Sequence, residues 1–307
     1  MEFKVIGIGE VLWDLLPSGP QLGGAPANFA CHSHDLGARA AVVSRVGQDG
    51  FGQELFARFK EMGLPGEALQ VDDQAPTGTV LVTLAEQGVP QFTIQENVAW
   101  DRLAVTASAL ETVREADAIC FGSLAQRHPI SRASIQRLVA ATPPGALRIF
   151  DINLRQSFYS REVIDQSLRL ANVLKLNDNE LPILASMLEL GKTPEQQIQR
   201  LAQSFGLRLV ALTRGARGSL LYSEGRWSEQ PSQPVQVVDT VGAGDAFTAA
   251  LVLGLLNGME MDELHAIAGE VARFVCSQAG ATPALPERFR SKFKYKQERT
   301  EDGSSFG

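Results

Sequence analysis

The sequence predicts an α/β protein with a mainly parallel central sheet covered by helices on both faces, and a small β-sheet lid. Between residues 116 and 213, short apolar segments alternate with helix-forming segments, as in parallel strands joined by helices. Residues 77–85 and 91–95 instead alternate apolar and polar side chains, as the strands of a half-exposed hairpin do. Residues 11–16 also have an extended pattern and could form the lid together with that hairpin.

The N-terminal quarter of the chain predicts a strand, a glycine-rich turn, a helix, a strand and a helix. In order, these are residues 4–9, 23–28, 29–36, 40–46 and 53–62. The paired glycines allow close backbone approach by a ligand, and Asn28 offers a donor and an acceptor on the first helical turn. Asn28 therefore either contacts a ligand or satisfies backbone groups of its own helix. Asp14, in an apolar run, either marks an exposed strand face or binds hydroxyl groups.

The rest of the chain supplies the α/β alternation. We expect strands at 118–121, 147–151, 173–176 and 207–213, helices at 131–141, 161–170, 180–190, 194–205, 246–256 and 262–278, a hairpin at 219–227, and an extended run at 234–238. Ligands of such sheets bind at the carboxyl ends of strands, where polar residues gather at 151–155, 177–180 and 213–218.

We expect a single domain over residues 1–286, with the lid formed by about residues 10–22 and 77–99. From Leu285 onward the sequence becomes charged and then rich in glycine and serine. Residues 287–307 are therefore predicted to be a flexible tail.

Composition limits the possible partners. The net charge of −7 over 307 residues argues against a general nucleic-acid binder. The three cysteines lie in apolar segments without Cys-x-x-Cys spacing, which indicates reduced thiols in a cytoplasmic protein. No apolar run approaches transmembrane length, so we expect no membrane partner. His32 and His34 are two residues apart on a helix and do not predict a metal pair.

The most informative segment is Asp-Thr-Val-Gly-Ala-Gly-Asp at residues 239–245. An extended run precedes it and a helix follows, so the amides near Gly242 and Gly244 can hold an anion at a helix N-terminus. Asp245 at that site is suited to accept a proton from a hydroxyl group that attacks a phosphoryl group. The alternative is a structural glycine-rich turn whose Asp complements the helix dipole.

Two further charged residues leave open alternatives. Arg155 either contacts a substrate anion or pairs with Asp151. Lys175 precedes the polar end of a predicted strand, and we expect it to flank a metal and phosphate region, since nothing marks a Schiff-base site.

These segments resemble the PfkB, or ribokinase-like, family of carbohydrate kinases over roughly residues 4–286. The resemblance rests on ordered motifs: Gly23-Gly24-x-x-x-Asn28 with Gly47-x-Asp49-x-x-Gly52, then Asn177-x-x-Glu180, then residues 239–245. Within the family, Gly-Glu-x-Leu-x-Asp at 9–14, Gly-Gly-Ala-Pro-Ala-Asn at 23–28 and Asp-x-Asn-x-Arg at 151–155 are most similar to fructokinases. The 2-keto-3-deoxygluconate kinases share much of that pattern.

The resemblance implies a ribokinase-like three-layer fold and an ATP-dependent sugar kinase, with fructose as the first candidate substrate. Asp245 would take the proton of the sugar's primary hydroxyl, and the amides of Gly242, Ala243 and Gly244 with that of Asp245 would form the anion hole. The expected sugar contacts are Asp14, Gly23, Gly24, Asn28, Asn97, Asn153 and Arg155. The expected nucleotide contacts are Lys175, Asn177, Thr213, Gly215 and Gly218.

The resemblance also implies ions and a partner subunit. Asn177 and Glu180 would place Mg²⁺ through water, and the backbone at Asp239 and Thr240 resembles a monovalent-cation loop, so K⁺ stimulation is expected. The lid resembles one that pairs two subunits, which predicts a homodimer.

One segment departs from fructokinases. Residues 96–101 are Glu-Asn-Val-Ala-Trp-Asp, where fructokinases usually carry an Ala-Asp-like segment. Trp100 either packs the lid onto the core or forms a wall of the sugar pocket, and the identity of the sugar stays open. A non-catalytic sugar- or nucleotide-binding protein on the same scaffold is the third reading, which the presence of Asp245, Asn177 and Glu180 disfavours.

Overall fold

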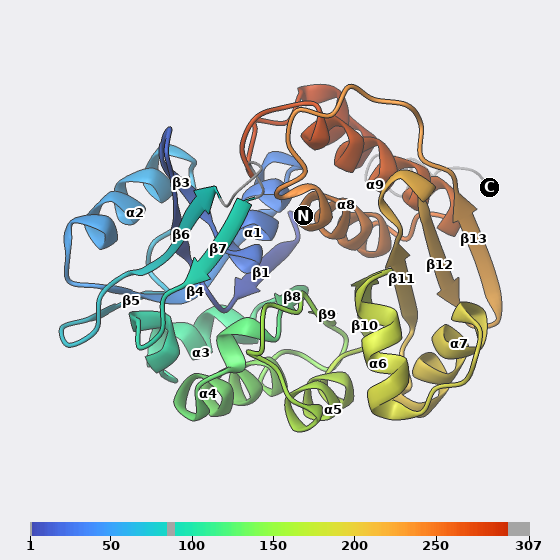
Figure 1. Ribbon diagram of the computed structural model, residues 1–307, viewed down its shortest axis with the longest axis horizontal. Helices are drawn as coiled ribbons and strands as arrows, with labels where there is room; N and C mark the ends of the chain where they lie inside the picture. The colour runs from blue at the N-terminus through green and yellow to red at the C-terminus, as the bar shows by residue number, and fades with distance from the viewer. Residues whose placement is uncertain (1, 85–89, 294–307) are drawn as a thin grey trace, which may run out of the picture.

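The computed structural model describes residues 2–84 and 90–293 and contains a large and a small sheet (Figure 1). The large sheet has nine strands in the order β13 (Arg226–Gln230), β12 (Ser219–Ser223), β11 (Leu209–Thr213), β10 (Val173–Asn177), β9 (Leu147–Asp151), β8 (Ala118–Phe121), β1 (Lys4–Ile8), β4 (Arg39–Gly47) and β5 (Leu69–Asp72). All neighbours pair in parallel except β11 with β12 and β12 with β13. The predicted mainly parallel sheet is confirmed.

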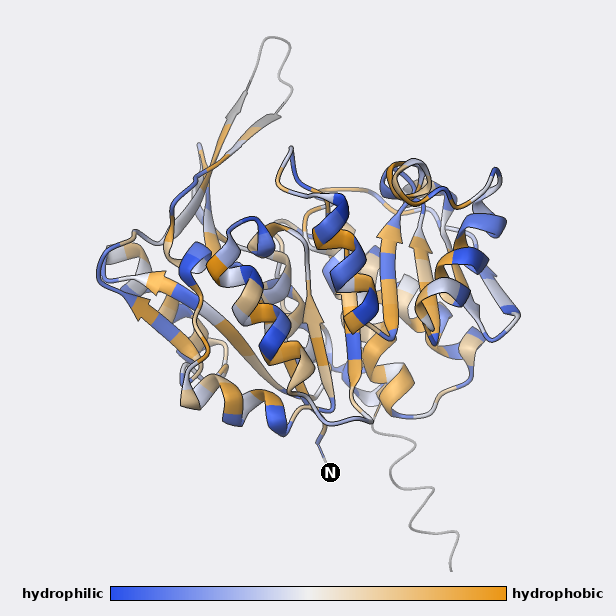
Figure 2. Ribbon diagram, turned by 90° about the horizontal axis from the view of Figure 1, so that it is seen from below, coloured by the Kyte–Doolittle hydropathy of each residue, from blue (hydrophilic) through white to orange (hydrophobic). Residues whose placement is uncertain are grey.

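Helices cover both faces of this sheet and make three layers (Figure 1). One face carries α1 (Ala25–Asp35), α2 (Gly50–Glu61), α8 (Ala243–Leu256) and α9 (Met261–Cys276), and the other carries α3 (Ala107–Arg114), α4 (Pro129–Ala140), α5 (Arg161–Leu170), α6 (Glu180–Leu188) and α7 (Pro194–Phe205). Successive strand residues point to opposite layers, so that Ile149 packs with α8 and Phe150 with the α4 side. Figure 2 accordingly shows mostly hydrophobic strands behind helices with hydrophilic outer faces.

The lid is the four-stranded sheet in the order β3 (Gly19–Gly23), β2 (Leu12–Leu16), β6 (Gly78–Leu84) and β7 (Pro90–Ile94). The predicted hairpin and its pairing with residues 11–16 are confirmed, and its turn, residues 85–89, lies outside the described residues. Trp100 is 1% exposed in the main core, and a Cβ added at Gly78 of β6 would collide with its Nε1. Trp100 therefore packs the lid onto the core.

Several element boundaries differ from the prediction. The first helix begins at Ala25 rather than at residue 29, because Gly24 is its N-cap and a proline occupies its first turn, where no donor is needed. The helix predicted at 246–256 begins at Ala243, which places the last three residues of the glycine-rich motif in its first turn. The short elements β3, β5 and α3 were not predicted, and the extended run expected at 234–238 belongs to neither sheet.

The predicted flexible tail is wrong for its first residues. Residues 287–293 are helical, and Phe289 and Phe293 are buried in the cluster that contains α8 and α9. Residues 294–307 lie outside the described residues. Within 2–84 and 90–293, no helix has the length and apolar character needed to cross a membrane.

Candidate active site

The carboxyl ends of β1, β8, β9, β10 and β11 lie at one edge of the large sheet, since these neighbouring strands are parallel. Strand order reverses between β1 and β8, because β4 follows β1 on one side and β9 follows β8 on the other. Ligands of open α/β sheets bind outside such a reversal. Many of the predicted site residues lie in or next to the loops at this edge, as expected.

The anion turn, residues 242–245, begins helix α8. Gly242 is the N-cap with a φ of 77°, a left-handed conformation that glycine adopts without steric cost. A Cβ there would also collide with the carbonyl of Ala281. First-turn amides have no earlier helical turn to donate to and carry partial positive charge. The turn therefore has the geometry of an anion-binding helix N-terminus.

Asp245 lies in this first turn and faces helix α1. Asn28 donates from Nδ2 to Oδ2 of Asp245 at 2.9 Å. Burial, and next the negative charge of Asp151, raise the pKa of Asp245 to about 6, while Lys175, Asn28 and Arg155 act in the opposite direction. The carboxylate is thus ionised at neutral pH yet basic enough to take a proton.

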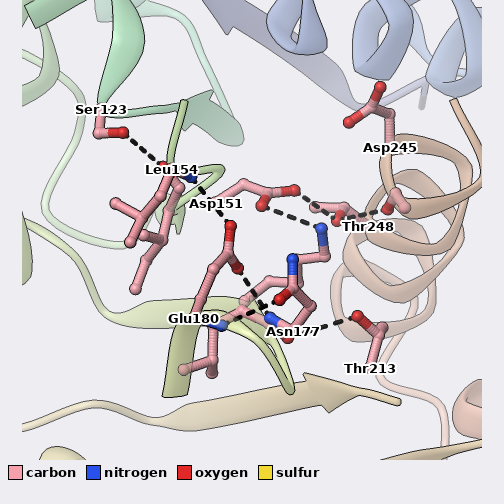
Figure 3. A network of polar contacts seen from close by, with 12 residues as sticks. Ser123, Asp151, Leu154, Asn177, Glu180, Thr213, Asp245 and Thr248 are labelled. Carbon is pink, nitrogen blue, oxygen red and sulfur yellow. Dashed lines mark hydrogen bonds and ion pairs between the residues drawn. The ribbon is translucent and has the colours of Figure 1, made fainter. Parts of the chain in front are cut away.

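A buried ion pair lies behind the anion turn. Lys175 on β10 and Asp151 on β9 face each other across the strand register, with Nζ 3.0 Å from Oδ1. Thr248 on α8 lies 3.1 Å from the second oxygen, Oδ2. Figure 3 shows Asp151 reaching Thr248 on the helix that also carries Asp245.

Arg155 does not pair with Asp151, so that alternative is wrong: the carboxylate of Asp151 is occupied by Lys175. Arg155 is exposed and donates from Nη1 to the carbonyl of Leu154 at 3.3 Å. Burial raises the pKa of Glu10, Asp14 and Asp245, and the charge of Arg155 opposes each rise. Arg155 is therefore a cation beside three acidic groups of the site.

The predicted sugar-side residues Asp14, Gly23 and Gly24 lie where the lid meets the core. Burial raises the pKa of Asp14, on β2, to about 6. A Cβ at Gly23 would collide with Oδ2 of Asp14, and one at Gly24 would lie 2.5 Å from the carbonyl of Glu10. The paired glycines thus allow close contact with Asp14 and with the backbone of Glu10, and not only with a ligand.

Glu10 was not among the predicted site residues. It is 2% exposed and lies two residues beyond the end of β1. Its Oε2, like Oδ1 of Asn28, is buried without a hydrogen-bond partner among residues 2–84 and 90–293. Burial raises its pKa to about 7, and the charge of Asp245 adds to that rise. The available signal was an acid placed between Gly9 and Val11 at the end of a buried strand.

Asn97 and Asn153 are loop residues with positive φ, 58° and 46°. Asn97 is exposed after the lid, and Asn153 is partly buried in the loop after β9. Asparagine tolerates this conformation better than most residues. The structure supplies a backbone reason for both asparagines and leaves their sugar contacts as predictions.

Asn177 and Glu180 join the ends of β9 and β10 (Figure 3). Oδ1 of Asn177 accepts from the amides of Asn179 and Glu180 at 2.9 and 3.0 Å. The Glu180 carboxylate accepts from the amides of Asn177 and Leu154 at 2.8 and 2.9 Å, and burial raises its pKa. Each carboxylate oxygen of Glu180 retains a lone pair that can accept from a water of a hydrated Mg²⁺, whereas both lone pairs of Asn177 Oδ1 are already used.

Asp239 connects the loop before α8 with the loop after α9 by two hydrogen bonds. Its Oδ1 accepts from the amide of Val241 at 3.0 Å and its Oδ2 from that of Gly280 at 3.2 Å. The carbonyl of Thr240 lies 3.4 Å from the amide of Ala243. Backbone carbonyls are ligands suited to a monovalent cation, and the side chain of Asp239 holds their loop in place.

The predicted nucleotide residues Thr213, Gly215 and Gly218 follow β11. Oγ1 of Thr213 lies 3.4 Å from the carbonyl of Leu176. A Cβ at Gly218 would collide with the carbonyl of Gln230 on β13, whereas Gly215 faces open space. The turn is therefore packed at one end and open at the other.

Within the described part of the chain, there is no group of three or more His, Cys, Asp or Glu side chains that could hold a metal ion. Nε2 of His32 lies 2.9 Å from the carbonyl of Ala281, and burial lowers its pKa to about 4.

The chain is similar to known proteins over most of its length. A family model described as pfkB family carbohydrate kinase matches residues 20–288. A putative sugar kinase of Pyrococcus horikoshii is 29% identical over 280 residues, 88% of this chain and 86% of the relative. A structure of that kinase in complex with ATP has a TM-score of 0.78 at 28% identity and covers 96% of this chain and 99% of its own.

Fructokinases are similar to the chain over a comparable length. The fructokinase of Escherichia coli is 31% identical over 306 residues, 94% of this chain and 98% of the relative. The fructokinase of Vibrio cholerae O395, solved with fructose, ADP and calcium ion, has a TM-score of 0.80 at 26% identity and covers 95% and 98% of the two chains.

Proposed function

The chain belongs to the pfkB family of carbohydrate kinases, and we propose that it phosphorylates D-fructose to fructose 6-phosphate with ATP. The observation that carries the proposal is the Asp245 carboxylate, held by Asn28 at 2.9 Å in the first turn of α8. A base and an anion-binding turn on the same residues are what transfer of a phosphoryl group to a hydroxyl requires.

In the proposed reaction, Asp245 takes the proton from the primary hydroxyl of the sugar. The oxygen of that hydroxyl attacks the γ-phosphorus of ATP. The new O–P bond forms as the bond from the γ-phosphorus to the β,γ-bridging oxygen breaks, and ADP leaves. Amides of the anion turn stabilise charge on the moving phosphoryl group. Mg²⁺, placed through water by Asn177 and Glu180, would neutralise phosphate charge.

The substrate side is proposed from the residues around Asp14 and Arg155. Fructose is the first candidate because fructokinases are similar to nearly the whole chain. The second candidate is 2-keto-3-deoxygluconate, since the exposed guanidinium of Arg155 beside buried acids could bind a substrate carboxylate. Lys175, Thr213, Gly215 and Gly218 are proposed to lie along the nucleotide.

K⁺ stimulation through the loops that Asp239 joins, and a homodimer through the lid, complete the proposal. Leu81 and Phe92 of the lid are 49% and 51% exposed but lie on opposite faces of the sheet, since Phe92 pairs with Val82, so the dimer is proposed from the resemblance of the lid. A cytoplasmic location stays a prediction from composition.

A coupled assay of ADP release tests the function. Fructose, 2-keto-3-deoxygluconate, ribose, tagatose and adenosine are compared with Mg²⁺, in the presence and absence of K⁺. The highest kcat/KM is expected for fructose. A preference for 2-keto-3-deoxygluconate would support the second candidate, and no phosphorylation of any sugar would favour a binding protein on this scaffold.

A further inference from the structure

We propose that Asp151 and Thr248 are positioning residues for the anion turn. Asp151 holds Lys175 as a fixed cation next to the turn, and Thr248 holds the peptide group between Gly244 and Asp245. The inference rests on the proposed function, because it concerns how the same site is held for phosphoryl transfer. Neither Asp151 nor Thr248 lies in the anion turn itself.

The network uses both oxygens of Asp151. One oxygen lies 3.0 Å from Nζ of Lys175 and the other lies 3.1 Å from Oγ1 of Thr248. The three residues are 4%, 7% and 0% exposed, respectively. Their side chains thus connect β9, β10 and α8 where little water can compete.

Thr248 also contacts the anion turn. Its Oγ1 also lies 2.9 Å from the carbonyl of Gly244, so that its proton is shared between that carbonyl and Asp151. In α8 the Gly244 carbonyl also accepts the helical bond from the amide of Thr248, so the hydroxyl adds a second bond to it. Because a peptide bond is planar, the amide of Asp245 on its other side is held with it. That amide is one of the donors proposed to stabilise the moving phosphoryl group.

Lys175, on β10 of the large sheet, lies next to the same turn. A Cβ added at Gly244 would lie 3.0 Å from Nζ of Lys175, so the glycine leaves room for the ammonium group. The ammonium group thus lies between the Asp151 carboxylate, 3.0 Å away, and the turn that has the geometry for an anion.

A purely structural role is the competing explanation. A buried ion pair often stabilises a fold no more than apolar residues would, so stability alone gives a weak reason for Asp151 and Lys175. A cation held in place before the reaction stabilises developing phosphoryl charge without reorganisation. A positioning role predicts a loss in turnover larger than any loss in stability.

The test compares Thr248→Val with Thr248→Ser and with Thr142→Val. Thr142 is a matched control because it is also buried and its hydroxyl donates to the carbonyl of Val139 at 2.9 Å. We expect Thr248→Val to lower kcat on the order of 10- to 100-fold, the scale of a misplaced reacting group, with the sugar KM within about twofold. Thr248→Ser should restore most of kcat, and Thr142→Val should keep it.

A second variant, Asp151→Asn, keeps the proposal testable if Thr248→Val folds poorly. Besides Asp151, the groups around Asp245 are Lys175, Arg155, Asn28 and Glu10. Removing the negative charge of Asp151 should shift the acid limb of kcat/KM to lower pH by about one unit. A kcat for Thr248→Val within about twofold of wild type, or an unshifted limb for Asp151→Asn, would overturn the inference. Wild-type protein without activity on any sugar would instead remove the proposed function.

Discussion

Asn28 and Asp245 are 217 residues apart in the sequence, and their side chains meet in a hydrogen bond of 2.9 Å. The bond joins the first turn of α1, next to the lid, to the first turn of α8, which carries the anion turn. Because Asn28 donates, it stabilises the ionised form of Asp245. The orientation of the proposed base is therefore fixed by the element that also borders the sugar side.

The first prediction concerns the base itself. Asp245→Asn should lower kcat by about 10²- to 10⁴-fold, the range of a general base, and leave sugar binding largely intact. Steady-state kinetics and calorimetric titration with the sugar measure the two quantities. Asp165→Asn on α5 is the control, since this exposed pair with Arg169 lies outside the site. Turnover of Asp245→Asn within about twofold of wild type would remove the assignment.

The second prediction is that the buried carboxylate of Asp245 destabilises the folded protein. Burial raises its pKa from 3.8 to about 6, so the unfolded chain releases this proton at lower pH than the folded chain does. The contribution of Asp245 to the free energy of unfolding therefore falls as pH rises from about 4 to about 6. Above about pH 6 the whole destabilising effect is present. We expect Asp245→Asn to raise Tm on the order of 5 °C at pH 7.5.

The advantage should shrink to about a third at pH 4.5, where folded wild type is almost fully protonated but the unfolded chain, with a pKa of 3.8, is still mostly ionised. Melting curves of the variant and wild type at both pH values isolate this group from the other titrating residues. An equal or lower Tm for the variant at pH 7.5 would show that the buried charge is not costly.

The fold was predictable where its signals are local. The bounds of α5 and α7 match the prediction, and Ser160 and Thr193 cap them with side-chain acceptors. By contrast, β3 is glycine-rich and becomes a strand by pairing with β2. The pattern of those five residues carries no strand signal of its own, because tertiary pairing forms the strand.

The site was predictable as separate residues but less so as a set of contacts. Asp245 and Asn28 could be selected from their motifs, but their hydrogen bond depends on how α1 and α8 pack. Arg155 was one alternative for pairing with Asp151, being four residues away in the chain. The register of β9 and β10 instead places Lys175 opposite Asp151, and sequence spacing within one segment holds no information about that neighbour.

The third prediction concerns Glu10, whose pKa of about 7 lies close to that of Asp245. The two charges raise each other's pKa, so the acid limb of kcat/KM should spread over two coupled ionisations. Glu10→Gln should leave a single, steeper step at lower pH. Glu115→Gln, on the exposed partner of Lys4, is the control. A wild-type profile that already fits one ionisation would contradict the coupling.

The final prediction concerns the backbone of the anion turn. Gly242→Ala places a Cβ against the carbonyl of Ala281 at a φ of 77°, so both the collision and the left-handed conformation oppose it. We expect a loss of about 2 kcal/mol or more in the free energy of unfolding, measured by urea denaturation. Gly145→Ala is matched, because a Cβ there meets nothing within 4 Å, and it should be near neutral. If the two variants unfold alike, α8 can shift to accept the side chain, and the glycine serves the anion rather than the fold.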